Sequence, residues 1–510
     1  MSDPTEKPRR AAKALRKGFD AGNAEAIARV RAVLPDAAEI KHADALHVIA
    51  REAGFASWPK LKFARETAAM DRAARAERLK MALFHGQTWV AEALLAETPD
   101  LGRDNFGLVC ALYDRDRVAE VLARDPAAAT RIVGIRRPMT HLAFSQHFKG
   151  GGSRPDMLAV ADLLLAHGAD VNDSYPYDGD ENAPLSALYG ALGHAGNLPL
   201  AEWLLEHGAD PNDGESLYHS TELGHTEGLR LLLRHGARPE RTNALPRALD
   251  FNDHEAVRLL LEAGADPNEG VEQHPSGEPS FVIPALHQAA RRMCDARMIA
   301  MLLEAGADPS MRYREMTPYS MARVYGNPAA ADLIAGAGGD TALSREERLL
   351  VAAAEDTLPE GEFIDPAKLP LDYRNLLRAM LHLPGKLPHV RRLVEIGLEY
   401  DRPDEMGLTP VQIAGWEGLP EVITYFLRLK PDLSHVNGYG GTLLSTIIHG
   451  SENCPARSER DHIACARLAL DEGVALPTRA IEFAGEPDMA EFLSGWAEAH
   501  PGQVVEGGIG

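Results

Sequence analysis

One phrase that returns five times limits what this chain can fold into more than any other feature. In its fullest form it reads Leu-Leu-x-x-Gly-Ala-Asp-x-Asn, and the copies lie at 163–172, 203–212, 231–240, 259–268 and 301–310. The shared glycines are spaced 40, 28, 28 and 42 residues apart. Self-similarity at periods of about 20 to 50 residues indicates an array of stacked units.

The phrase predicts how each unit ends. The leucines continue the apolar stripe of a helix, and the glycine, for example Gly168, is suited to the left-handed residue that follows a helix. The Asp-Pro-Asn after it begins a turn that cannot extend the helix. We therefore expect Leu232 and Leu260 to be buried between consecutive units, and the histidines before three of the glycines to bind the last helical carbonyls.

A second phrase precedes each of these helix ends. It is clear in Pro284-Ala-Leu-His-Gln-Ala-Ala and in the two Thr-Pro pairs at 317–318 and 409–410. Thr before Pro is typical of a helix start, where the hydroxyl caps the helix and proline occupies the first turn. Small residues such as Ala289 allow this first helix to pack closely against its neighbour.

The two phrases together resemble ankyrin repeats, whose pattern is G-x-T-P-L-H-x-A-A, then G-H/N, then L-L-x-x-G-A-D-x-N. Gly407, Thr409, Pro410 and Ala414 match the opening, and the five Gly-Ala-Asp or Gly-Ala-Arg endings match the close. The resemblance implies an all-α, ankyrin-type helical solenoid of about a dozen stacked helix-turn-helix units with a small helical N-terminal cap. It also implies that the first helices and the fingers, the loops between units, line a concave binding surface.

The chain divides by composition and by the clarity of the repeat. We predict a basic helical N-terminal segment at 1–70, a repeat array at 77–340 that is clearest at 160–340, an irregular acidic and Pro-rich link at 341–370, degenerate repeats at 371–498 and a flexible tail at 499–510. The fingers at 170–184 and 266–284 are unusually long. Insertions in repeat arrays lie in loops on one face, often the face that binds.

Charge separates the N-terminal segment from the rest. Residues 1–80 hold 17 Lys and Arg against 11 Asp and Glu, whereas the whole chain carries −22, so the other 430 residues carry −28. Ala50 and Gly54 have the spacing of a helix-turn-helix, and the helix expected after Ser57 bears Lys60, Lys62 and Arg65. This segment is predicted to be a solvated basic cap, and the alternative is a DNA-associated regulator that uses these three residues.

The motifs of catalysis and metal binding do not occur. Four scattered cysteines form no Cys-x-x-Cys pair, Gly150–Gly152 lacks the P-loop lysine, and neither His-Glu-x-x-His nor Gly-x-Ser-x-Gly is found. Asp178-Gly-Asp-Glu-Asn opens like a calcium loop, but Ala183 and Tyr189 occupy its glycine and glutamate positions. We predict a cytoplasmic, monomeric, non-enzymatic protein without cofactor or membrane span. A further hypothesis is an enzyme hidden in the C-terminal third of the chain, and no set of residues supports it.

A binding scaffold is therefore the predicted function. Recognition energy concentrates in exposed aromatic and Arg side chains, and the candidates on the fingers and first helices are Tyr175, Tyr177, Asp178, Tyr218, Phe281, Tyr313 and Arg314. The finger 173–181 combines two tyrosines with four carboxylates, which favours a protein or peptide partner with a basic surface. The alternatives are that the tyrosines pack between adjacent fingers, or that this finger is a disordered loop without a role.

Overall fold

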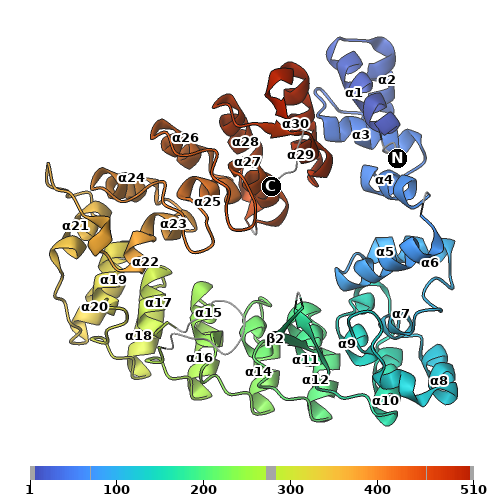
Figure 1. Ribbon diagram of the computed structural model, residues 1–510, viewed down its shortest axis with the longest axis horizontal. Coiled ribbons are helices and arrows are strands. Elements are labelled where there is room, and N and C mark those ends of the chain that lie inside the picture. The colour runs from blue at the N-terminus through green and yellow to red at the C-terminus, as the bar shows by residue number, and fades with distance from the viewer. Residues whose placement is uncertain (1–5, 69, 178, 271–282, 455, 506–510) are drawn as a thin grey trace. The chain divides into compact units, whose positions relative to one another are not determined.

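The computed structural model describes residues 6–68, 70–177, 179–270, 283–454 and 456–505. The chain forms two compact units. Unit 1 contains 1–66, 323–326 and 342–510, and unit 2 contains 67–322 and 327–341. Figure 1 labels the elements of both units.

Unit 2 is a stack of antiparallel helix pairs. Its elements are α5 (Arg72–Phe84), α6 (Thr88–Glu97), α7 (Phe106–Ala111), α8 (Arg115–Arg124), η1 (Pro126–Thr130), α9 (Pro138–Ala143), η2 (His147–Gly150), α10 (Arg154–Ala166), β1 (Ser174–Tyr177), β2 (Asp180–Ser186), α11 (Ala187–Tyr189), η3 (Gly190–His194), α12 (Leu198–Glu206), α13 (Ser216–Ser220), α14 (Glu227–Arg234), α15 (Ala244–Asp250), α16 (His254–Glu262), α17 (Ala285–Arg291), α18 (Ala296–Glu304), α19 (Pro318–Tyr325) and α20 (Pro328–Gly336). First helices pack on first helices, as α15 does on α17, and second helices pack on second helices, as α12 does on α14.

The helices of unit 2 end as the repeated phrase predicts. All five shared glycines have positive φ, between 89° and 96°, and an added Cβ at any of them would meet nothing within 4 Å. Glycine is therefore needed for the left-handed backbone and not for space. His167 and His207 bind the carbonyls of Leu163 and Trp203 through Nδ1 at 2.8 and 2.7 Å, which confirms the predicted capping role for these two.

The last residue of the phrase joins neighbouring units. Asn172 accepts a hydrogen bond from the Asp210 backbone N–H at 2.8 Å and donates to the Gly208 carbonyl at 3.3 Å. Asn212 accepts from the Arg238 N–H at 2.8 Å in the same way. These bonds satisfy backbone groups just beyond the helix ends, so the phrase that ends one unit also fixes the position of the next.

Apolar side chains fill the space between consecutive helix pairs. Leu232 and Leu260 are fully buried, which confirms their predicted place, and so is Ala289 on the first-helix layer. All four cysteines are buried and free. None of the described helices is both long enough and apolar enough for a membrane crossing.

Unit 1 contains the N-terminal helices and the second part of the array. Its elements are α1 (Glu6–Asp20), α2 (Ala24–Val33), α3 (His42–Glu52), α4 (Trp58–Thr67), α21 (Arg345–Ala354), η4 (Pro366–Lys368), α22 (Leu371–Arg374), α23 (Leu376–Leu381), α24 (Leu387–Glu395), α25 (Pro410–Trp416), α26 (Pro420–Arg428), α27 (Leu443–Asn453), η5 (Arg457–Glu459), α28 (His462–Asp471), β3 (Leu476–Pro477), α29 (Thr478–Phe483), α30 (Pro487–Ala499), η6 (Pro501–Gln503) and β4 (Val504–Val505). In the second part of the array, α25 packs on α26 and on α27, and α28 packs on α26 and on α27.

The predictions of an irregular link at 341–370 and of a flexible tail at 499–510 are partly wrong. The link at 341–370 contains α21, which Ser344 starts by accepting a hydrogen bond from the Glu347 N–H, while the Glu347 carboxylate accepts from the Ser344 N–H. The tail at 499–510 is also structured as far as residue 505. Gln503 donates to the carbonyls of Leu470 and Val474 at 2.7 Å, and β4 pairs in parallel with β3.

The N-terminal helices have a hydrophobic core of their own. Its buried members are Ala12, Leu15, Ala26, Val30, Ile40, Ala45, Leu46, Val48, Ile49, Ala50, Trp58 and Leu61, all from α1–α4 and their connections. Pro59 lies in the first turn of α4, where proline is tolerated.

Candidate functional site

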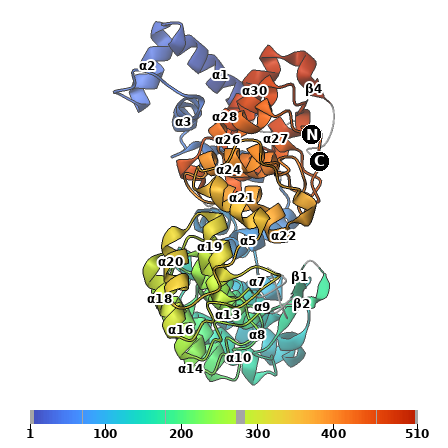
Figure 2. The same cartoon turned by 90° about the vertical axis from the view of Figure 1, so that its left-hand side faces the viewer.

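Two neighbouring fingers of unit 2 form short β-hairpins. The first, residues 131–137, closes with a bridge between Val133 and Arg136 around Gly134, whose φ is +70°. The second consists of β1 and β2, which pair antiparallel from Ser174↔Ser186 to Tyr177↔Asp180 and project beyond the helices of unit 2 (Figure 2). The long finger is thus an ordered hairpin in its described residues, which contradicts the disorder part of the disordered-loop alternative and leaves its role a prediction.

Arg136 connects these two hairpins. Its guanidinium lies 4.2 Å from the ring centroid of Tyr175, 4.6 Å from that of Phe84 and 4.9 Å from that of Phe144. Nη2 also donates a hydrogen bond to the Tyr175 hydroxyl at 2.8 Å. Burial lowers the pKa of Arg136, while Tyr175 acts in the opposite direction. A cation held against three aromatic rings restricts both fingers.

The base of the hairpin pair rests on buried aromatic and histidine side chains. Phe144 packs edge-on against Tyr175 with 5.2 Å between ring centroids. It also covers Gly190, where an added Cβ would lie 2.4 Å from the Phe144 ring, so glycine is required by the close approach. His141 donates from Nε2 to the Val133 carbonyl at 2.9 Å, and burial lowers the pKa of His141 to about 4.

The tips of the two hairpins carry exposed apolar side chains. Ile135 is 66% exposed, Ile132 is similarly open, and Tyr177 is 61% exposed. Single exposed apolar side chains are common on protein surfaces. Several of them at the tips of two adjacent hairpins that Arg136 holds together form a surface suited to binding. We name Ile132, Ile135 and Tyr177 the first finger surface.

The structure divides the predicted partner-binding residues. Tyr175 is only 6% exposed and Tyr313 7%, so the expectation that they are exposed is wrong: Tyr175 binds Arg136, and Tyr313 pairs with Met316 in a hairpin. The burial of these two tyrosines agrees with the alternative prediction, in which the tyrosines pack at the fingers. Arg314 is exposed at the turn of that hairpin, with φ +48°.

Tyr218 is half-buried beneath Arg247, whose guanidinium lies 5.6 Å from its ring centroid. Asp178 and Phe281 lie outside the described residues. Binding by the candidate residues stays a prediction, with Tyr177 and Arg314 the best exposed among those described.

The carboxylates of the long finger are not equivalent. Asp173 is buried and pairs with Arg137 at 3.4 Å, and its pKa is raised mainly by burial. It therefore acts inside the finger and contributes little to a long-range field. Asp180 is exposed.

A second finger surface lies in the degenerate repeats of unit 1, where the sequence analysis named no candidate. The Gly438 N–H donates to the Met406 carbonyl at 2.8 Å, and an added Cβ at Gly438 would lie 2.6 Å from that oxygen, so the backbones of two fingers touch. Met406, Val436 and Tyr439 are exposed, Tyr439 to 71%, and the Tyr439 hydroxyl contacts Met406 Sδ at 3.0 Å. The Gly-x-Gly-Gly run at 438–441 was the available signal.

The residues predicted for nucleic-acid binding lie along α4. Lys60 and Arg65 are exposed, whereas Lys62 is half-buried and 3.8 Å from Glu66. The DNA-associated alternative stays a prediction.

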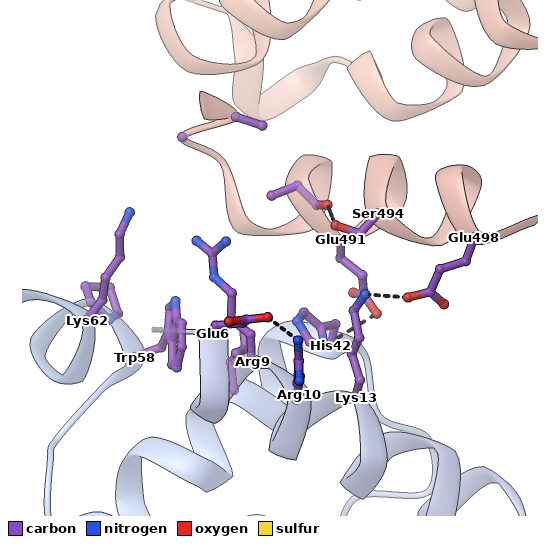
Figure 3. Close-up of a pocket in the computed structure, with 15 residues that line it drawn as sticks. Glu6, Arg9, Arg10, Lys13, His42, Trp58, Lys62, Glu491, Ser494 and Glu498 are labelled. Atoms are coloured by element: carbon purple, nitrogen blue, oxygen red, sulfur yellow. Dashed lines mark hydrogen bonds and ion pairs between the residues drawn. The ribbon is translucent and has the colours of Figure 1, made fainter. Parts of the chain in front are cut away.

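A cavity of about 430 Å³ lies within unit 1, between α1, α3 and α4 on one side and α30 with the residues just before it on the other (Figure 3). Its walls mix both charges: Arg9, Arg10 and Lys13 come from α1, and Glu491 and Glu498 from α30. Among the described residues, no group of three or more His, Cys, Asp or Glu side chains is placed to hold a metal ion. The cavity therefore lacks the arrangement of a metal centre.

The comparisons with known proteins agree with the repeat geometry. Residues 187–270 match the family model for ankyrin repeats, in three copies. Similar solved structures include an ankyrin repeat domain from Acinetobacter baumannii AYE (25% identity, 40% of this chain and 98% of that chain, TM-score 0.31) and the human ASB11 ankyrin repeat domain (17% identity, 49% of this chain and 96% of that chain, TM-score 0.24). No curated protein matches the chain.

The matched repeats, the helix ends they share and the bonds between successive units define a stack of ankyrin repeats in unit 2. Ankyrin repeats generally mediate protein–protein interaction, and the family is typically non-enzymatic.

Proposed function

We propose that this chain binds another protein through the first finger surface of unit 2. The observation that carries the proposal is the pairing of exposed tips with a buried brace: Ile135 and Tyr177 are open to solvent, while Arg136 and Tyr175 fix the hairpins beneath them. A surface that is already ordered loses little conformational entropy on binding, so more of its contact energy contributes to affinity.

The partner we propose has apolar side chains flanked by basic residues. Asp180 is exposed beside Tyr177, and the chain beyond residue 80 carries −28, so a basic partner is attracted at long range. Arg131 and Arg137 of the neighbouring finger pair with Asp125 and Asp173, and so contribute little net charge against such a partner. The partner's apolar groups would contact Ile135 and Tyr177.

We place this activity in the cytoplasm and in a monomer. The four cysteines are free and buried, which suits a reducing compartment. The second finger surface, Met406, Val436 and Tyr439, offers an additional contact of the same apolar kind on unit 1.

The test is affinity capture of partners by the full chain, followed by calorimetry on each captured protein. Tyr177→Ala and Ile135→Ala are expected to weaken binding by about tenfold or more each, as centrally placed apolar contacts do. Phe251→Ala, an exposed aromatic at the turn between α15 and α16, is the matched control and is expected to have no effect.

Unfolding midpoints of all three variants should equal that of the parent chain, because the three side chains are exposed. Unchanged affinity for Tyr177→Ala and Ile135→Ala, with the fold intact, would remove this surface from the binding site.

A further inference from the structure

Within unit 1, the N-terminal helices have a hydrophobic core of their own. Their buried apolar cluster runs from Ala12 to Leu61, so residues 6–66 supply their own core. Contacts that a segment makes outside its own core can be reversible.

Two ion pairs join α1 of this module to α30, beside a packing contact between α3 and α30. Arg16 of α1 pairs with Glu491. Lys13 lies with its Nζ 2.9 Å from Glu498 Oε1 (Figure 3). Both basic side chains are about 40% exposed and Glu498 is more open still, whereas Glu491 is 19% exposed. An ion pair as exposed as Lys13–Glu498 is weak and is screened by salt, and the partly buried Arg16–Glu491 pair is screened less.

At the same contact, the backbone N–H of His42 in α3 hydrogen-bonds the Glu491 carboxylate, whereas the His42 imidazole adds no attraction. Its Nδ1 is 3.6 Å from Glu491 Oε1, too far for a hydrogen bond, and is buried without a hydrogen-bond partner. Burial lowers the pKa of His42 to about 4, and Lys13, Arg16 and Arg9 add to the shift, so the imidazole is neutral at pH 7. The cavity of about 430 Å³ beside it shows that the two faces are incompletely packed.

We propose that residues 6–66 act as a clasp: a folded module that docks reversibly on α30 through the Arg16–Glu491 and Lys13–Glu498 ion pairs. Rising ionic strength, or a more strongly charged competitor, releases it with its fold intact. Release bares the carboxylates of α30 and the basic face of α1 at the same time. The clasp is independent of the finger surfaces and of any partner bound there.

Energy transfer between two fluorophores tests the clasp in the full-length chain. Ala38→Cys in the N-terminal module and Glu472→Cys just after α28 are exposed labelling sites, and the four native cysteines are buried. Transfer is expected to fall by about twofold or more between 0.05 and 1 M salt, as the screening length shrinks from roughly 14 to 3 Å.

Charge reversal identifies the residues. Glu491→Lys is expected to lower transfer at low salt, and the exchanged pair Arg16→Glu with Glu491→Lys is expected to restore it. Lys17→Glu makes the same charge change on an exposed position of α1 and should leave transfer unchanged. Circular dichroism of each variant checks that helix content is retained.

Transfer that is insensitive to salt and to Glu491→Lys would overturn the proposal. So would failure of the exchanged pair to restore transfer in a chain of full helix content, since a merely structural role would not be rescued by the swap. If Glu491→Lys does not fold, the salt titration of the parent chain and the exchanged pair still decide the outcome.

Discussion

The side chain of Asn268 holds the backbone of Asp308, in the next repeat. Its Oδ1 accepts from the Asp308 N–H at 2.6 Å, and its Nδ2 donates to the Gly306 carbonyl at 2.9 Å. This pair of bonds spans the long insertion at 266–284. The register of two consecutive helix pairs is therefore kept although the chain between them is lengthened.

Replacing Asn268 tests this connection. Asn268→Ala is expected to lower the free energy of unfolding by about 1–2 kcal/mol, because two backbone groups lose their partners. Urea unfolding followed by circular dichroism measures the change. Glu206→Ala, an exposed helical position in the same unit, should have an effect close to zero; equal losses in both variants would show that Asn268 has no special role.

The buried leucines test the stacking itself. Leu232→Ala or Leu260→Ala is expected to cost about 2–5 kcal/mol through lost burial and a cavity. Because repeat arrays are stabilised by nearest-neighbour contacts, the loss should appear as a separate early unfolding step. The half-buried Leu261→Ala provides the comparison, and a single transition at the parent midpoint for Leu260→Ala would contradict the assigned packing.

The brace beneath the first finger surface depends on one hydroxyl. Tyr175→Phe removes the acceptor that Arg136 uses, and a hydrogen bond to a charged donor contributes about 1.5–3 kcal/mol. The variant should therefore unfold at lower urea concentration than the parent. Tyr177→Phe alters an exposed ring and should unfold at the same urea concentration as the parent. If Tyr177→Phe instead unfolded at a lower urea concentration than Tyr175→Phe, the roles of the two tyrosines would be exchanged.

His219 makes part of the stability of unit 2 dependent on pH. Burial acts to lower its pKa, but hydrogen bonds from its two ring nitrogens to Glu215 and Glu222, at 3.2 and 2.8 Å, outweigh burial and raise the pKa to about 9. A raised pKa stabilises the fold fully below the unfolded value of about 6.5, and this stabilisation is lost as pH rises toward 9.

Unfolding free energies at pH 6 and pH 9.5 measure that loss. Between these two pH values, the free energy of unfolding of the parent chain is expected to fall by at most about 3 kcal/mol more than that of His219→Gln. The reason is that the variant has no titrating ring at this position. Equal pH dependence in the two proteins would show that the His219 pKa is not raised.

The basic residues of α4 provide the test of the nucleic-acid alternative. We expect the full chain to show no retention on duplex DNA that falls with salt, because the acidic charge of the remaining residues opposes binding. Retention at low salt that is lost when Lys60, Lys62 and Arg65 are all changed to Glu would instead support the DNA-associated regulator.

The features that could be predicted from sequence are those determined within one repeat. Gly264 ends its helix, Leu260 is buried and His207 caps, because each of these depends on residues within one turn of helix. The burial of Tyr175 depends on Arg136, which belongs to the preceding finger, and no pattern in the sequence around Tyr175 predicts that contact. The second finger surface was missed because its repeats lack the Gly-Ala-Asp ending.

The contact between α1 and α30 could not be predicted for a related reason. Arg16 and Glu491 are separated by most of the chain, and the basic character of 1–80 suggested an external partner rather than α30. A basic segment in an otherwise acidic chain indicates that the segment can attract an acidic surface. It does not indicate whether that surface belongs to the same chain or to another molecule.

Unit 1 is assembled from stretches on either side of residues 67–341, and this order matters during synthesis. Domains generally fold as they emerge from the ribosome. The α1–α4 segment is translated before unit 2, and α30 is translated after it. The carboxylates that pair with the basic face of α1 are therefore made only after unit 2, so this contact cannot form until unit 2 has been translated.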